Sequence, residues 1–308
     1  MKGVQIMLED VRKRLITNEA LFNTIHVIQQ KFEILPDDKK HIGVCIDYQD
    51  ISELRNEFIN ELIDSVIDWV YNSKKYKEMK NHFMLKGKSE AAASSEIRRK
   101  AHQKFRKGDD CKLLAQGQIG ELLLFHFIQR YFEAAPLLRK MNITTSASHE
   151  RFGADAIHYK VHNNKNIIIL GEAKTYTSEY KFNSAFEDAL NSILKTYMDH
   201  RKELNLYVHE DFLDEEMDEV AEAYLNNTMG KVEVHLVSII IYNESKKVDI
   251  TDEEDIQDQI EEIICERYSK FDNSKIKITE NPILKRITYI AFPIWQLEEL
   301  VKEFQNLI

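Results

Sequence analysis

The chain has 308 residues, of which 43% are hydrophobic and 31% are charged. A chain of this length and composition can bury a substantial core, which excludes a disordered or fibrous protein. Its formal net charge is −10 at pH 7, whereas an autonomous nucleic-acid-binding protein is usually basic.

The cysteines Cys45, Cys111 and Cys265 lie far apart and form no Cys-x-x-Cys pair. This spacing argues against a disulfide framework and against a structural zinc site. The N-terminus becomes charged too early for a signal peptide, and no apolar stretch approaches the ~20 residues needed to span a bilayer. We therefore expect a cytoplasmic protein without a membrane partner.

Residues 1–112 are predicted to form a mainly helical N-terminal region. The pattern predicts a short strand from Ile42 to Tyr48 and then a helix to about Tyr71, with its apolar residues on one face. The stretch from Lys86 to Ser95 is predicted to be a linker or loop.

A basic segment covers residues 74–112, with 13 Lys or Arg against 5 Asp or Glu. It directly precedes the next predicted helix, so it could form a cationic strip that contacts phosphates. A solvated helix face or a mobile linker has the same composition, and these readings stay open. The candidate nucleic-acid-binding residues are Arg98, Arg99, Lys100, Lys104, Arg106 and Lys107.

A strongly helical, apolar stretch follows from Leu113 to Phe132 and carries Glu121. A carboxylate on such a helix lies at its exposed edge or is buried, and buried acids are usually paired or bind a metal. Taken alone, Glu121 is better explained by a structural role. Gly117 and Gly120 would allow this helix to approach a sheet closely.

Two strands are predicted from Ala156 to Val161 and from Ile167 to Ala173. The polar residues Asn163 and Asn164 lie between them and are typical of a two-residue hairpin loop. The register of such a hairpin follows from its loop alone.

In that register Asp155 lies directly opposite Glu172. Directly opposite side chains share a face, with Cβ atoms roughly 4.5–5.5 Å apart. Lys174 falls on the same face because strand side chains alternate. An apolar sheet face would thus carry two carboxylates and a lysine at one end.

Two carboxylates this close repel each other, and each loses solvation beside an apolar layer. A divalent cation removes both penalties, and hard oxygen ligands suit Mg²⁺ best, with Mn²⁺ expected to substitute. The alternative is a surface salt bridge of Lys174, because Glu-x-Lys also occurs at 78/80, 179/181 and 244/246. The candidate ligands are Asp155, Glu172, Glu121 and the carbonyl of Ala173.

This series of elements resembles the core of the PD-(D/E)xK nuclease superfamily, with the order αβββαβ. The more specific resemblance is to HamA, the nuclease subunit family of Hachiman antiphage systems. Ala154 stands where the superfamily has its name-giving proline, which many members lack. The resemblance is carried by the Glu121 helix, Gly153-Ala154-Asp155, Gly171-Glu172-Ala173-Lys174-Thr175-Tyr176, a helix from Ala185 to His200 and a strand from Val232 to Tyr242.

The resemblance implies an α/β fold with a mixed central sheet flanked by helices, and a nuclease core over residues 113–308 with a C-terminal strand-helix extension. It implies Mg²⁺-dependent cleavage of DNA, with Asp155, Glu172 and Glu121 holding the metal. Lys174 would orient the attacking water or stabilise the phosphate charge. A superfamily-two helicase like HamB is the implied partner, and the acidic net charge favours such dependence. Two alternatives stay open: a non-catalytic or weakly catalytic helicase-binding subunit, and a restriction-type endonuclease of another defence system.

Overall fold

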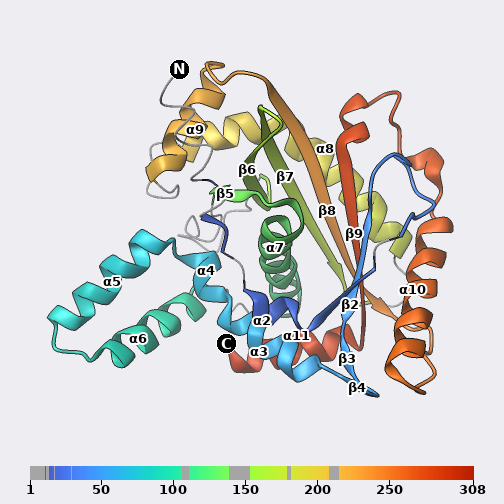
Figure 1. The fold of residues 1–308 in the computed structure, drawn as a ribbon, viewed down its shortest axis with the longest axis horizontal. Helices are drawn as coiled ribbons and strands as arrows, with labels where there is room; N and C mark the ends of the chain where they lie inside the picture. The colour runs from blue at the N-terminus through green and yellow to red at the C-terminus, as the bar shows by residue number, and fades with distance from the viewer. Residues whose placement is uncertain are drawn as a thin grey trace.

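The computed structural model describes residues 11, 14–16, 18–28, 30–105, 111–138, 153–178, 182–207 and 215–308. These residues build a seven-stranded mixed sheet with helices on both faces (Figure 1), so the predicted mixed α/β class is confirmed. The sheet has the strand order β1-β2-β9-β8-β7-β6-β5, and β3 and β4 form a separate pair. The strands are β1 Ile25–Ile28, β2 Ile42–Ile46, β3 Tyr48–Gln49, β4 Ser52–Glu53, β5 Ala135–Leu138, β6 Ala156–His162, β7 Lys165–Tyr176, β8 Val232–Glu244 and β9 Ile287–Trp295.

Strands β2, β9, β8 and β7 run parallel, and the antiparallel neighbours β1, β6 and β5 complete the sheet. Parallel neighbours need long crossovers, which are usually helical. Here α8 and α9 connect β7 to β8, and α10 connects β8 to β9. The helices are α2 Glu19–Phe22, α3 Arg55–Asp64, α4 Val66–Val70, α5 Ser73–Leu85, α6 Glu90–His102, α7 Cys111–Phe132, α8 Phe182–Tyr207, α9 Glu215–Leu225, α10 Glu253–Ser269 and α11 Leu297–Leu307.

The predicted hairpin is present with its predicted register. Ala156 pairs with Gly171 at its open end, and the pairing continues to the loop. Asn163 and Asn164 have φ of 50° and 56°. A two-residue type I′ turn requires positive φ at both positions, which Asn tolerates better than most residues.

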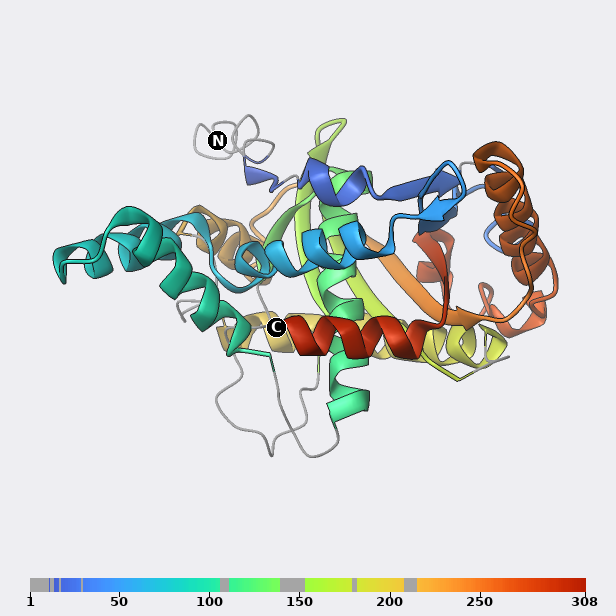
Figure 2. The same cartoon turned by 90° about the horizontal axis from the view of Figure 1, so that it is seen from below.

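The sheet separates two apolar layers. Ile157, Ile168 and Leu170 of the hairpin belong to the layer that contains α8 and α10. Ile167 and Ile169 belong to the layer that contains α7, α3 and α11. Figures 1 and 2 show α7 and α8 on opposite faces of the sheet. Residues of β7 with even numbers therefore face α8, and those with odd numbers face α7.

The N-terminal region contributes to the same sheet, because β2 pairs in parallel with β9. Strands from before and after residue 112 are thus joined by hydrogen bonds. The predicted strand from Ile42 is confirmed, and the predicted helix up to Tyr71 is divided into α3 and α4 at Ser65.

The linker predicted from Lys86 to Ser95 is wrong in its second half, where α6 begins at Glu90. The hydroxyl of Ser89 accepts from Ala92 N at 3.3 Å and caps that helix. Alanine has the highest helix propensity, so the alanine run continues the helix. Helices α5 and α6 form an arm that projects from the sheet in both views (Figures 1 and 2).

The C-terminal part follows the prediction except at one strand. Strand β8 covers the predicted strand from Val232 to Tyr242, and helix α10 follows it. The sequence pattern also predicts a pair of strands that ends with Arg286 to Pro293, but the structure has one strand there, β9, preceded by two short 3-10 helices, Asn273–Lys275 and Pro282–Arg286. In the described part of the chain, no helix combines the length and apolar character that crossing a bilayer demands.

Buried His41 predicts a pH dependence of stability. Its Nε2 lies 3.1 Å from the carbonyl of Pro36, and its Nδ1 accepts from Tyr289 N at 3.1 Å. Both contacts are satisfied only when the ring is neutral, with the proton on Nε2. Burial lowers the pKa of His41 from 6.5 to about 4.

As the pH falls below 6.5 the unfolded chain binds this proton first, so the free energy of unfolding decreases until about pH 4. Urea unfolding should show a loss of about 2 kcal/mol from this group between pH 7.5 and 5. A His41→Gln variant should lack that part of the slope, and His82→Gln on the exposed face of α5 should keep it. Equal slopes in the two variants would contradict the assignment.

Candidate functional site

Asp155 lies at the open end of the β6–β7 hairpin, one residue before the first ladder pair. Its N–H donates to the carbonyl of Gly171 at 3.1 Å. Its carboxylate accepts from the N–H of Ala173 at 2.9 Å. These two hydrogen bonds hold Asp155 beside β7, where the pairing of β6 with β7 ends. Ala173, whose carbonyl the sequence analysis proposed as a metal ligand, is its hydrogen-bond partner there.

Glu172 is 6% exposed and faces the layer that contains α8. Its Oε1 lies 3.1 Å from Nζ of Lys174, which is the next residue on that face. Its Oε2 accepts from the hydroxyl of Thr196 of α8 at 3.1 Å. The structure thus brings Glu172 and Lys174 into direct contact, and Asp155 lies at the adjoining strand end.

The Glu172–Lys174 pair differs from a solvated surface salt bridge. The lysine side chain is 26% exposed and the glutamate side chain 8%. Exposed ion pairs form easily and contribute little to stability, whereas a nearly buried carboxylate must be compensated. Here one ammonium group and one hydroxyl group contribute to that compensation.

Two further polar residues lie on the same face of the sheet as Glu172 and were not among the candidate site residues predicted from the sequence. Ser238 of β8 is the register partner of Glu172 and is fully buried. Its hydroxyl has no hydrogen-bond partner among the described residues. Tyr176, two residues beyond Lys174, donates its hydroxyl to Asp188, and burial raises its pKa to about 12.

The face of α8 that packs on the sheet carries three buried polar residues among its apolar ones. Thr196, His200 and Glu203 are 5–7% exposed and recur at helical spacing. His200 contacts the hydroxyl of Tyr224 at 2.6 Å through Nε2, and burial lowers its pKa. The spacing of these three polar residues by four and three positions is visible in the sequence, and it could have identified them as candidates for the site.

Glu203 fixes the chain just before Asp155. Its carboxylate accepts from the N–H of Ala154 at 2.7 Å. Gly153 has φ of 143°, and a Cβ there would lie 2.0 Å from Glu203 Oε1. Gly153 is therefore required both by its backbone conformation and by the carboxylate packed against it.

Glu121 lies on α7, on the opposite side of the sheet from Glu172. The neighbouring Gly120 faces β7, where a Cβ would lie 2.6 Å from Thr175 Oγ1 and 3.2 Å from Ala173 Cβ. The predicted close approach of α7 to the sheet is present at Gly120. Across the described ranges, no group of three His, Cys, Asp or Glu is arranged to hold a metal ion. The structure does not bring Glu121 into such a group with Asp155 and Glu172, and its role as a ligand stays a prediction.

Three of the six predicted nucleic-acid-binding residues, Arg98, Arg99 and Lys100, lie on α6. Arg98 pairs with Asp64 at 2.6 Å, and Arg99 pairs with Glu96 at 2.5 Å. Helix α6 packs through Ile97 into the layer of α7, away from the face that carries Glu172. Lys100 is half-buried on α6 and Lys104 is exposed after it, whereas Arg106 and Lys107 lie outside the described residues.

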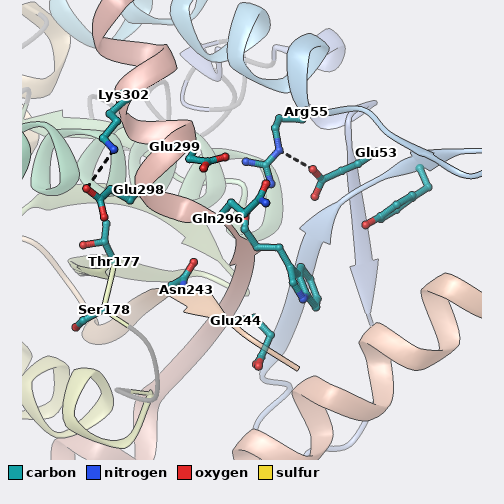
Figure 3. Close-up of a pocket in the computed structure, with 12 residues that line it drawn as sticks. Glu53, Arg55, Thr177, Ser178, Asn243, Glu244, Gln296, Glu298, Glu299 and Lys302 are labelled. Atoms are coloured by element: carbon teal, nitrogen blue, oxygen red, sulfur yellow. Dashed lines mark hydrogen bonds and ion pairs between the residues drawn. The ribbon is translucent and has the colours of Figure 1, made fainter. Parts of the chain in front are cut away.

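A pocket of about 670 Å³ lies at the carboxyl ends of β7, β8 and β9 (Figure 3). Figure 3 shows Thr177 and Ser178 beside Asn243 on one side of it. Its lining carries more carboxylates than cations, which makes it a poor site for phosphates. The charged residues that line it are Glu53, Glu244, Glu298 and Glu299, with Arg55 and Lys302.

Comparison with known proteins gives one family. The family model described as HamA matches residues 20–308, which is most of the chain. A search of curated proteins returned no match. The match includes both sides of residue 112 and every element of the hairpin site.

Proposed function

Because this chain belongs to the HamA family, whose members are components of Hachiman antiphage defence, we propose that it is the Mg²⁺-dependent DNA nuclease of such a system. The observation that carries the proposal is the nearly buried Glu172, in contact with Lys174 and beside Asp155 at the adjoining strand end. The order α7-β5-β6-β7-α8-α9-β8, in which α9 is added to the expected αβββαβ series, supports the PD-(D/E)xK assignment that the sequence suggested.

The residues present suit Mg²⁺. This ion is usually held by one or two carboxylates, with water and substrate phosphates completing an octahedron. Asp155 and Glu172 supply two carboxylates from adjoining strand ends. The hydroxyl of Ser238, the register partner of Glu172, has no partner among the described residues and adds an oxygen to this donor set.

When bound, Mg²⁺ would polarise a phosphate oxygen and lower the pKa of a coordinated water. The chain supplies the positioning. Thr196 and the N–H of Ala173 hold the two carboxylates in place through hydrogen bonds of 3.1 and 2.9 Å. The ammonium of Lys174 lies within reach of the same centre, where it would orient water or balance the charge of the phosphate.

The net charge of −10 supports control by a partner. A free chain with this charge is expected to bind DNA weakly, because phosphate binding needs clustered cations. We propose a superfamily-two helicase, like HamB, as the partner that delivers DNA. The same charge favours the second candidate, a helicase-binding subunit whose cleavage is weak or secondary.

Plasmid cleavage tests the proposal. The purified chain with its helicase partner is expected to cut DNA with Mg²⁺ or Mn²⁺, to cut less without the partner, and to lose all cleavage with EDTA. A Glu78→Gln variant, which changes the exposed glutamate of a Glu-x-Lys sequence on α5 where Glu78 pairs with Lys75, should cut as the parent does. Absence of cleavage in every metal, with the partner present, would favour the binding-subunit candidate.

A further inference from the structure

A cavity of about 660 Å³ lies where β1, β2 and the start of β9 meet the C-terminal end of α7. This volume is within the range of roughly 300–1,000 Å³ that small-molecule sites occupy in proteins. Its apolar lining packs against the core layer of α7, so the cavity lies on the face of the sheet opposite Glu172. It shares no lining residue with the acidic pocket of Figure 3.

One part of the cavity wall is apolar. Val27 of β1, Ile42 of β2, and Tyr131 and Phe132 of α7 line it, and each of these side chains is only partly buried. Apolar surface that stays accessible inside a cavity is covered favourably by an apolar group of a ligand. This part of the wall therefore favours a ligand with an apolar body.

Three lysines line the same cavity without ion partners. In the part of the chain that the structure describes, the ammonium groups of Lys31, Lys39 and Lys40 form no ion pair. His41 adds no charge near pH 7, because burial lowers its pKa to about 4. Three cations around one cavity, none of them balanced by a carboxylate, favour an anionic group such as a phosphate.

Two carboxylates also line the cavity. Asp37 and Asp38 lie in the connection between β1 and β2, and neither forms an ion pair with the three lysines. An ionised carboxylate only accepts hydrogen bonds, so it suits a ligand that carries hydroxyl or amino donors. A bare phosphate would account for the lysines, but it would be repelled by both aspartates.

We infer that this cavity binds a nucleotide. Its phosphate lies at the lysines, its base lies against the apolar part of the wall, and its sugar hydroxyl groups donate to the aspartates. A nucleotide combines an anion, a flat apolar body and several donors in one molecule, which matches the three kinds of lining. The assignment does not rest on the proposed nuclease function, because neither Glu172 nor Lys174 lines the cavity.

Calorimetry with AMP in EDTA tests the site without requiring cleavage, because EDTA removes any metal through which Glu172 could hold a phosphate. AMP is expected to bind roughly tenfold more tightly than adenosine or inorganic phosphate, since each of these lacks part of the contacts. The same measurement with GMP, CMP and UMP identifies the preferred base.

Replacing Lys39 and Lys40 together with glutamine should weaken the binding of AMP about tenfold. The matched control replaces Lys231 and Lys247 with glutamine. These two lysines are also exposed and form no ion pair with a described residue, and they lie outside the cavity. The control variant should bind AMP as the parent does.

The Asp38→Asn variant separates a nucleotide from a simple anion. Loss of the carboxylate charge should strengthen the binding of inorganic phosphate, because a repulsion is removed. AMP should gain less, because it loses an acceptor for its hydroxyl groups. An equal gain for both ligands overturns the nucleotide assignment. No binding of any mononucleotide by the parent chain, or equal affinities in the two lysine double variants, overturns the site itself, whatever the cleavage assay gives.

Anisotropy of a labelled oligonucleotide in EDTA identifies the source of the nucleotide. A lower affinity in the Lys39/Lys40 double variant than in the Lys231/Lys247 control, together with displacement of the oligonucleotide by AMP, supports the end of a nucleic-acid strand as the occupant. Binding of AMP with no difference between the two variants in oligonucleotide affinity supports a free nucleotide.

Discussion

Replacing Glu172 with glutamine is expected to reduce DNA cleavage by roughly a thousandfold, because the metal would lose one of its two carboxylates. The fold should persist. Glutamine keeps an oxygen that accepts from Thr196, and Lys174 is exposed enough to be solvated without its partner. Plasmid nicking with Mg²⁺ and urea unfolding of the same preparation measure the two effects separately.

The Lys174→Ala variant should lose cleavage to a similar extent and keep its affinity for Mn²⁺, because both carboxylates remain. Its loss removes a cation that contacts the nearly buried Glu172, so some stability should be lost as well. Glu78→Gln on the exposed face of α5 is the control for each assay. Metal-dependent nicking that persists in Lys174→Ala would refute the role of the lysine.

The hairpin could be predicted because its determinants are local. Asn163 and Asn164 specify the turn, the turn fixes the register, and alternation then places Glu172 and Lys174 on one face. A shift of one residue would have moved the apolar residues of β7 to the wrong layer. The relative positions of Glu172 and Lys174 can therefore be predicted from the sequence of the hairpin alone.

The position of α7 is not determined in the same way. Its helical period predicts that one face is buried, but it does not specify which face of the sheet it covers. Gly120 correctly predicted a close approach, and the approach is to Thr175 and Ala173 on the face opposite Glu172. That choice depends on how the whole chain crosses the sheet, which the local pattern around Glu121 does not contain.

The partners of Glu172 are distant in the sequence. Thr196 lies on a helix that returns across the sheet, and Ser238 lies on the parallel strand beyond it. Parallel pairing needs a crossover, so its register is fixed by tertiary packing rather than by a turn. The pairing of β2 with β9 joins residues about 250 positions apart and has no local signal.

Substituting Gly153 with alanine is expected to lower the free energy of unfolding by about 3 kcal/mol. At φ of 143° an L-residue is strained, and the new Cβ would lie 2.0 Å from the carboxylate of Glu203. That carboxylate cannot move aside freely, because it is buried and accepts from Ala154 at 2.7 Å. Either the helix or the start of β6 has to shift.

Cleavage should fall with stability, since Asp155 lies two residues after Gly153 and its carboxylate accepts from the N–H of Ala173. Gly230→Ala, where nothing lies within 4 Å of the added Cβ, is the matched control and should behave as the parent chain in urea. Glu203→Gln keeps an acceptor for Ala154 and should retain most of the stability, whereas Glu203→Ala should not. If Gly153→Ala unfolds at the same urea concentration as Gly230→Ala, the close packing of Glu203 against this segment is not what positions Asp155.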